Sequence, residues 1–193
     1  MTGTVLEATR EVMRRFGLTT VFGNPGTTEV PFLSDWPEDF RYVLGLQESV
    51  VVSMADAYAQ LTRHPVLVNL HSAGGVGHGL GSLFNAARGH SPVIVLAGQQ
   101  DRSMLAEEPF LGATEAAAFP RPYARWSHEP ASPQEVPGAL ARAFRHAATP
   151  PRGPAFLSVP VGDWDAPAGP VELPEPGPLR GVAPHPDAVS ELV

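Results

Sequence analysis

One acidic residue, Glu48, lies between two apolar segments. The run "YVLGL" (42–46) precedes it, and residues 50–59 are apolar almost all the way round a helix. A carboxyl group that is shielded from water favours its protonated form unless it is paired, and a protonated acid can donate a hydrogen bond to a ring nitrogen. The simpler interpretation is a first-turn acid that stabilises the N-terminus of a helix.

A second candidate, His71, directly follows the apolar run "PVLVNL" and opens the glycine-rich stretch "HSAGGVGHGLG" (71–81). This stretch is not the dinucleotide fingerprint, because a motif begun at either possible glycine lacks its third glycine. Phosphate binding at the start of the following helix remains a weak alternative. His71 therefore has two interpretations, a structural hydrogen bond or a functional role, and His78 in the same stretch is a lesser candidate.

The third candidate is the stretch "GNPGTTE" (23–29), which follows another apolar run. Its proline fixes φ and its glycine permits positive φ, so the pattern predicts a tight turn. Gly26 would let the backbone approach a ligand, and Thr27 and Thr28 would offer hydroxyl groups. The alternative is an ordinary turn between a strand and a helix.

Strand-like and helical segments alternate along the chain and must position these candidates. The predicted strands are 19–23, 42–46, 65–70, 92–98, 123–127 and 154–160, and the predicted helices are 3–16, 48–62 and 133–148. Residues 71–89 are predicted as a further helix that is entered through a glycine-rich loop over 71–81. Most strands are apolar runs without period-2 alternation, so both faces of the sheet should be covered. This predicts an α/β fold with a doubly wound, mostly parallel sheet of about six strands and helices on both faces.

The three candidate stretches would then meet at one edge of the sheet. Residues 23–29, 46–49 and 71–81 each follow a predicted strand, and ligands in open α/β sheets bind beyond the carboxyl ends of the strands. Their coincidence is more informative than any one of them.

Composition removes several classes of function. Among the 193 residues there is no cysteine, which excludes disulfides, a thiolate nucleophile and a cysteine-based metal site, and no lysine, which excludes a Schiff-base or P-loop lysine. The net charge of −7, without a basic stripe, argues against a nucleic-acid partner. The sequence also predicts no membrane span and no signal peptide, so we expect a cytoplasmic protein.

The character of the chain changes after residue 162. We expect a domain over 1–162, a Pro-rich linker over 163–185 and the start of a truncated further domain over 186–193, where "PDAVSELV" begins a helix that stops after two turns. The alternative for the last segment is a frayed tail.

Six motifs together carry a resemblance that no single one would support. They are "FGNPGTTEVPFL", "LQES", "NLHSAGGVG", "SPVIVLAGQQ", "PRPYARWS" and "GPAFLSVPVGDWD". From about Thr4 to Asp165 the chain resembles the N-terminal, pyrimidine-binding domain of thiamine-diphosphate enzymes, and within them it is most similar to the benzoylformate decarboxylases.

The resemblance gives Glu48 and the first loop a role. In this family a glutamate at the position of Glu48 hydrogen-bonds the cofactor pyrimidine and promotes its imino tautomer, which deprotonates the thiazolium carbon. Asn24, Pro25 and Gly26 match the loop that passes close to the pyrimidine. Thr27 stands where benzoylformate decarboxylases have a serine that contacts the substrate carboxylate, and its added methyl group leaves the exact substrate open.

The resemblance also assigns the two histidines. His71 matches an active-site histidine that transfers protons around the covalent intermediate. His78 stands where the family has an amide residue in the same stretch, and we expect it near the cofactor.

Other parts of the family's machinery do not match anything in this chain. The diphosphate and Mg²⁺ are bound in the family through a Gly-Asp-Gly…Asn segment of a separate C-terminal domain, and "VGDWD" (161–165) is not that segment. The resemblance therefore predicts no metal ligand here and a chain that is inactive alone. It also implies a homodimer or homotetramer, which we expect to pair through helix 48–62.

Three hypotheses follow for function. The first is a domain of a thiamine-diphosphate-dependent decarboxylase that acts on a small 2-keto acid. The second keeps the same chemistry in an acetolactate synthase-like carboligase. The third is a non-catalytic α/β module that binds a ligand or a partner protein and uses Glu48 only for packing.

Overall fold

The computed structural model describes residues 3–170 of the chain. It has six strands, five α-helices and four short 3₁₀ helices within that range. The strands are β1 (Thr20–Asn24), β2 (Arg41–Leu44), β3 (Val66–Leu70), β4 (Val93–Gln99), β5 (Trp126–His128) and β6 (Ala155–Pro160). The α-helices are α1 (Val5–Arg15), α2 (Val30–Leu33), α3 (Glu48–Thr62), α4 (Ser72–Arg88) and α5 (Val136–Ala148). The 3₁₀ helices are Thr27–Glu29, Arg102–Glu107, Pro133–Glu135 and Val161–Asp163.

The strands form one sheet in the order β2-β1-β3-β4-β6-β5, and every neighbouring pair is parallel. The predicted α/β fold is confirmed, and the sheet is entirely parallel where we expected it to be mostly so. Strands β3, β4 and β6 are buried along their whole length, as their apolar sequences require when both faces are covered.

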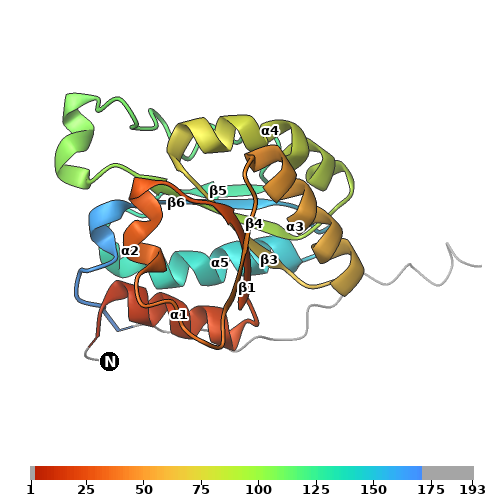
Figure 1. Ribbon diagram of the computed structural model, residues 1–193, viewed down its shortest axis with the longest axis horizontal. Helices are drawn as coiled ribbons and strands as arrows, with labels where there is room; N and C mark the ends of the chain where they lie inside the picture. Colours follow the sequence, from red (N-terminus) through yellow and green to blue (C-terminus); the bar gives the residue numbers. More distant parts are fainter. Residues whose placement is uncertain (1–2, 171–193) are drawn as a thin grey trace, which may run out of the picture.

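Two helical layers cover the sheet, with α1 and α5 on one face and α3 and α4 on the other (Figure 1). Each layer has its own core. The first is built around Val12, Leu140 and Phe144, and the second around Val52 and Leu83. The apolar faces of α1 and α5 point into the first core, and valine and alanine make up most of the second.

Helix α4 corrects one expectation. We expected residues 71–81 to be a glycine-rich loop, but α4 begins at Ser72 and includes those glycines. At Gly79 the reason is close packing, because a Cβ there would lie 3.3 Å from both Leu70 Cδ1 and Val52 Cγ2. Gly79 therefore lets α4 approach α3, and Ser53 and Ser82 hydrogen-bond across this contact at 3.0 Å.

The described part of the expected linker packs on the domain. Trp164 is buried in the core beside Phe32, and the backbone of residues 164–168 hydrogen-bonds with residues 3–6. The buried Asp163 accepts two 2.8 Å hydrogen bonds from Arg102. Packing thus continues at least to residue 168. The remainder of the expected linker and the helix expected over 186–193 lie outside the described residues.

Within residues 3–170, no helix is long and apolar enough to cross a membrane.

Candidate functional site

The candidate residues gather where the strand order changes direction. The chain runs from β1 outward to β2 and then returns to β3 on the other side of β1, which creates a crevice beyond the carboxyl ends of these strands. Asn24 and Leu70 are partners in the parallel register, so the first loop and His71 leave the sheet side by side. This register explains why the candidate stretches, which were predicted to meet at one edge of the sheet, lie close together there.

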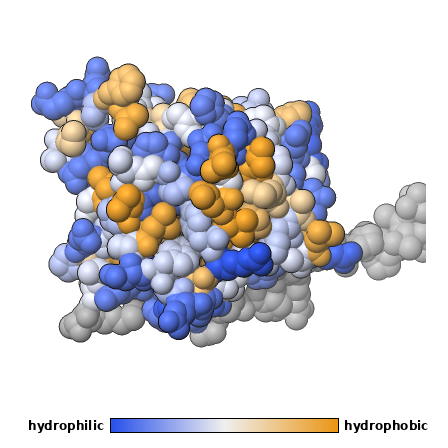
Figure 2. Space-filling model, viewed as in Figure 1, coloured by the Kyte–Doolittle hydropathy of each residue, from blue (hydrophilic) through white to orange (hydrophobic). Residues whose placement is uncertain are grey.

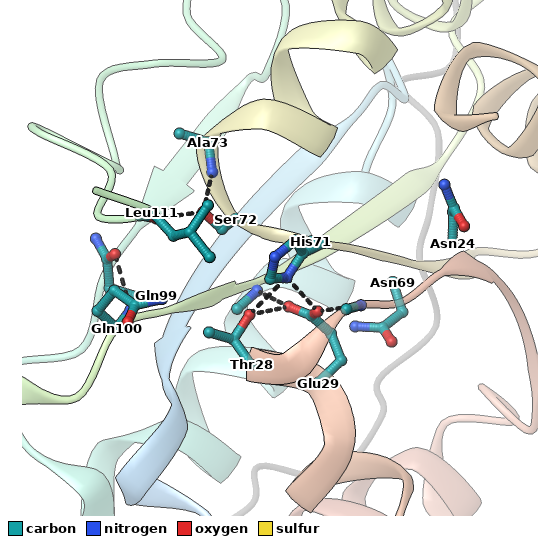
Figure 3. Close-up of polar contacts among 12 residues, drawn as sticks. Asn24, Thr28, Glu29, Asn69, His71, Ser72, Ala73, Gln99, Gln100 and Leu111 are labelled. Carbon is teal, nitrogen blue, oxygen red and sulfur yellow. Dashed lines mark hydrogen bonds and ion pairs between the residues drawn. The ribbon is translucent and has the colours of Figure 1, made fainter. Parts of the chain in front are cut away.

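His71 belongs to a bonded cluster on this edge (Figure 3). Its Nδ1 lies 2.9 Å from Oε2 of Glu29 and 3.0 Å from Oγ1 of Thr28. The Glu29 side chain is only 1% exposed, whereas the His71 ring is 25% exposed. One edge of the ring is therefore tied to the interior while part of the ring remains accessible.

Glu29 is the centre of this cluster, and the sequence did not identify it. Its Oε1 accepts from the Gly98 backbone N–H at 2.9 Å and from the Thr28 hydroxyl at 2.7 Å. Its Oε2 accepts from the Gly26 backbone N–H at 2.8 Å. The only signal in the sequence was Gly98 inside an otherwise bulky strand, since a glycine there marks a close approach of another group.

Two glycines make room for the cluster. A Cβ at Gly98 would overlap the Glu29 carboxylate and would lie 2.7 Å from Cβ of Thr28. A Cβ at Gly26 would overlap the His71 ring, with Cδ2 at 2.6 Å. The predicted close approach at Gly26 is thus an approach to His71 in this chain.

Glu48 has different partners. Its Oε1 accepts from the Asn24 amide at 3.0 Å, and its Oε2 lies 3.2 Å from Nδ1 of His78. The Glu48 side chain is 12% exposed and that of His78 is 71% exposed. The structure therefore brings Asn24, Glu48 and His78 together as a second cluster, which is shielded but reaches the surface. His78 comes to it from α4 and not from a loop.

Thr27 and Pro25 face outward. Thr27 is exposed, and with Pro25, Gly26 and Val30 it lines an open concavity of about 500 Å³. The neighbouring Thr28, which was predicted only to offer a hydroxyl group, is the threonine that bonds to His71.

Tyr42 is a half-buried polar residue near this edge. Its hydroxyl donates to Oδ1 of Asn69 at 3.3 Å and fills the space that a side chain at Gly23 would need. Burial, together with the negative charge of Glu29, raises the pKa of Tyr42 well above its usual range. Tyr42 is therefore a neutral donor at physiological pH.

The loop after β4 is tethered above the same edge. Both the N–H and the carbonyl of Ala113 bond the buried amide of Gln99 at 3.0 Å. The Ser72 hydroxyl donates to the Leu111 carbonyl, and Ser72 has a φ of +51° immediately after His71 (Figure 3). These contacts hold the apolar residues Phe110 and Leu111, both exposed, near the start of α4.

An apolar surface flanks the Glu48 cluster. Figure 2 shows apolar atoms gathered on the face where α3 and α4 lie in Figure 1. The exposed apolar residues of this region are Leu46, Val50, Tyr58, Leu61 and Phe84, and Leu61 is 87% exposed. Single exposed residues are ordinary, but a group of this kind beside a candidate site indicates a surface that another molecule covers.

Comparison with known proteins gives a consistent result. Residues 3–119 match the family model described as thiamine pyrophosphate enzyme, N-terminal TPP binding domain. The chain is 54% identical over 165 residues to the protein named benzoylformate decarboxylase of Pseudomonas aeruginosa, covering 86% of this chain and 31% of that protein. It is 30% identical over 146 residues to the acetolactate synthase of Bacillus subtilis, covering 75% of this chain and 25% of the relative.

A solved structure agrees with these matches. The crystal structure of benzoylformate decarboxylase from Polynucleobacter necessarius superposes with a TM-score of 0.91 and 45% identity, covering 98% of this chain and 36% of that one. The chain therefore spans between a quarter and about a third of the length of these relatives.

Proposed function

We propose a function from the premise that this chain belongs to the thiamine pyrophosphate enzymes, as their N-terminal TPP-binding domain. The proposed function is the cofactor-binding part of a decarboxylase that acts on a small 2-keto acid, similar to benzoylformate decarboxylase. One observation carries this choice over the carboligase alternative, namely the 54% identity to a benzoylformate decarboxylase against 30% to an acetolactate synthase.

The residues of the second cluster fit thiamine diphosphate. Glu48 presents a carboxyl group that is shielded from water, and one of its two partners is the largely exposed His78, which a ligand can displace. When bound, thiamine diphosphate supplies a carbon nucleophile that accepts the electrons released by decarboxylation. Glu48 would hold the pyrimidine and exchange a proton with it, Asn24 would fix the carboxyl group, and Pro25 and Gly26 would border the ring.

Two other side chains would act on the substrate. His71 is partly exposed at the same edge, so its free ring nitrogen can hold or move a proton at the reacting centre. The exposed Thr27 hydroxyl can hydrogen-bond the substrate carboxylate, and Val30 in the same concavity offers an apolar wall.

The proposal includes an assembly. Val50, Tyr58 and Leu61 expose apolar surface along α3, which supports pairing of two copies through this helix as a homodimer or within a homotetramer. We also propose a cytoplasmic location and a Mg²⁺-bound diphosphate that is held outside residues 3–170.

A domain exchange tests the proposed function. Residues 3–168 would replace the matching segment of the Pseudomonas aeruginosa enzyme, and decarboxylation of benzoylformate and of pyruvate would be measured with thiamine diphosphate and Mg²⁺. We expect turnover of a 2-keto acid. Glu48→Gln in the exchanged protein should lower kcat by about 100-fold or more, because an amide cannot exchange the carboxyl proton.

Two results would contradict this proposal. One is a folded, cofactor-loaded exchange protein without turnover of either 2-keto acid. The other is near-normal turnover of the Glu48→Gln variant. Glu38→Gln, which changes an exposed acid of the same domain, is the matched control and should leave kcat unchanged.

A further inference from the structure

Glu29 is a buried acid to which the proposed function gives no role. It comes from the 3₁₀ helix Thr27–Glu29, and its side chain is 1% exposed. A carboxyl group so removed from water is costly unless it is paired or hydrogen-bonded. Its neighbours therefore decide what it does.

The four contacts of Glu29 define its protonation state. The backbone N–H groups of Gly26 and Gly98 can only donate, one to each oxygen, and the Thr28 hydroxyl donates to Oε1. An ionised carboxylate has about four acceptor positions on its two oxygens and no donor. Three donors plus one His71 nitrogen fill these positions, so the cluster matches the ionised form.

An ionised Glu29 fixes the proton on His71. Because the carboxylate can only accept, Nδ1 of His71 must carry a hydrogen and donate it to Oε2 of Glu29. The Thr28 hydroxyl uses its hydrogen on Glu29, so it too accepts from Nδ1 at 3.0 Å. Both neighbours of Nδ1 are acceptors, and the neutral ring is left with an unprotonated Nε2.

The backbone is shaped for this arrangement. Gly98 lies against Glu29 and Gly26 lies against the His71 ring, and a Cβ at either position would overlap these side chains. The next residue, Ser72, has a φ of +51°, a conformation that costs energy for a residue other than glycine. The fold thus has local strain directly after His71 and glycine backbone against both its ring and Glu29.

We propose that Glu29 is a positioning residue for His71, which it holds in the Nδ1–H tautomer so that Nε2 is the ring nitrogen offered to the substrate. The arrangement follows the general rule that the hydrogen bond of one ring nitrogen sets the role of the other. The use of Nε2 in a reaction rests on the proposed function. The tautomer itself does not.

The tautomer can be measured directly. The 193-residue chain would be labelled with ¹⁵N-histidine, and two-bond ¹H–¹⁵N correlation spectra would be recorded at a pH at which the rings are neutral, with His71→Gln identifying the signal of His71. We expect a protonated Nδ1 and an unprotonated Nε2. A signal with the proton on Nε2 would overturn the proposal without any variant.

Two variants and a control sharpen the test. Glu29→Gln should shift His71 toward the Nε2–H tautomer, while Thr28→Val, which keeps the carboxylate, and Glu38→Gln should leave it Nδ1–H. A folded Glu29→Gln variant with an unchanged tautomer, or a reversal in Thr28→Val, would show that Glu29 is not the controlling group.

Activity provides a separate measurement. In the exchanged decarboxylase, Glu29→Gln should lower kcat by about 10-fold to 100-fold, as for other groups that orient a functional histidine. An unchanged kcat in a protein with a shifted tautomer would overturn the positioning role. An exchange protein that fails to decarboxylate at all would leave the spectra unaffected, so the two proposals fail in different ways.

Discussion

Glu29 and Glu48 lie after neighbouring strands at one edge of the sheet, yet they are built in different ways. Glu29 is 1% exposed, and its carboxylate has four partners within the chain. Glu48 is 12% exposed, and one of its two partners is the exposed His78. One carboxylate is complete without any ligand, whereas the other keeps acceptor capacity for a group from outside.

This difference separates structural from reactive acids at one site. A buried carboxylate with every acceptor position filled contributes to stability and orients what it touches, because its removal leaves donors unpaired. A shielded carboxylate with weak or displaceable partners contributes little to folding and remains able to hydrogen-bond a ligand. The comparison predicts that the same substitution mainly lowers stability at Glu29 and mainly lowers activity at Glu48.

The largest expected difference is in the stability of the acid-to-amide variants. Glu29→Gln turns an acceptor into a donor beside existing donors and should lower the free energy of unfolding by roughly 3 kcal/mol, since each buried donor left unpaired costs about 1–3 kcal/mol. Glu48→Gln can keep the hydrogen bond from Asn24 and should change the free energy of unfolding by less than about 0.5 kcal/mol. Urea denaturation of the chain measures both free energies of unfolding. Equal losses in the two variants would contradict the distinction between a structural and a ligand-binding glutamate.

The next largest effect is expected from Gly98→Ala. The new methyl group would overlap the Glu29 carboxylate and approach the Thr28 side chain, so the cluster must move or lose its backbone bond. We expect a loss of roughly 2 to 3 kcal/mol in the free energy of unfolding. Gly81→Ala, where a Cβ would meet nothing within 4 Å, is the control and should not destabilise. A Gly98→Ala variant as stable as the parent would show that the cluster is loose.

Much of this fold could be predicted from the sequence because its signals are local. Apolar runs located all the strands except β5, which lies at Trp126–His128 and not at the predicted 123–127, and helix α3 begins and ends at the predicted residues 48 and 62. The candidate site followed from a general rule for parallel sheets together with short motifs, which named Glu48, His71 and the first loop.

The remainder depends on contacts between distant residues. In the sequence Glu29 looks like an ordinary acid at the start of a short helix, and its burial involves contacts with distant residues such as Gly98, 69 residues away. The glycines at the start of α4 favoured a loop over residues 71–81, because glycine content alone does not distinguish flexible backbone from close helix packing at a residue such as Gly79. Trp164 lies in a proline-rich stretch, and its place in the core depends on contact with α2.

The two threonines of the first loop extend the comparison at a smaller scale. Thr28 is buried and bonds to Glu29 and His71, so Thr28→Val should lower the free energy of unfolding by about 1 to 2 kcal/mol. Thr27 is exposed, and Thr27→Val should change the free energy of unfolding by less than about 0.5 kcal/mol. Thermal unfolding of the two isosteric variants measures the difference, and a larger loss at Thr27 would reverse the assignment of the inward-facing hydroxyl.

The smallest expected effect has the opposite sign and concerns the space beside Glu48. A Cβ at Gly75 would lie 3.5 Å from both Cγ and Oε1 of Glu48, which is ordinary van der Waals contact. Gly75→Ala should therefore raise the free energy of unfolding by about 0.5 to 1 kcal/mol, because alanine restricts the unfolded chain and favours the helix. The same substitution is thus expected to stabilise beside one glutamate and to destabilise beside the other, at Gly98. Both variants add one methyl group next to a carboxylate. A loss of stability at Gly75 comparable to that at Gly98 would mean that the Glu48 site is as tightly closed as the Glu29 site. The contrast between a structural and a ligand-binding acid would then no longer hold.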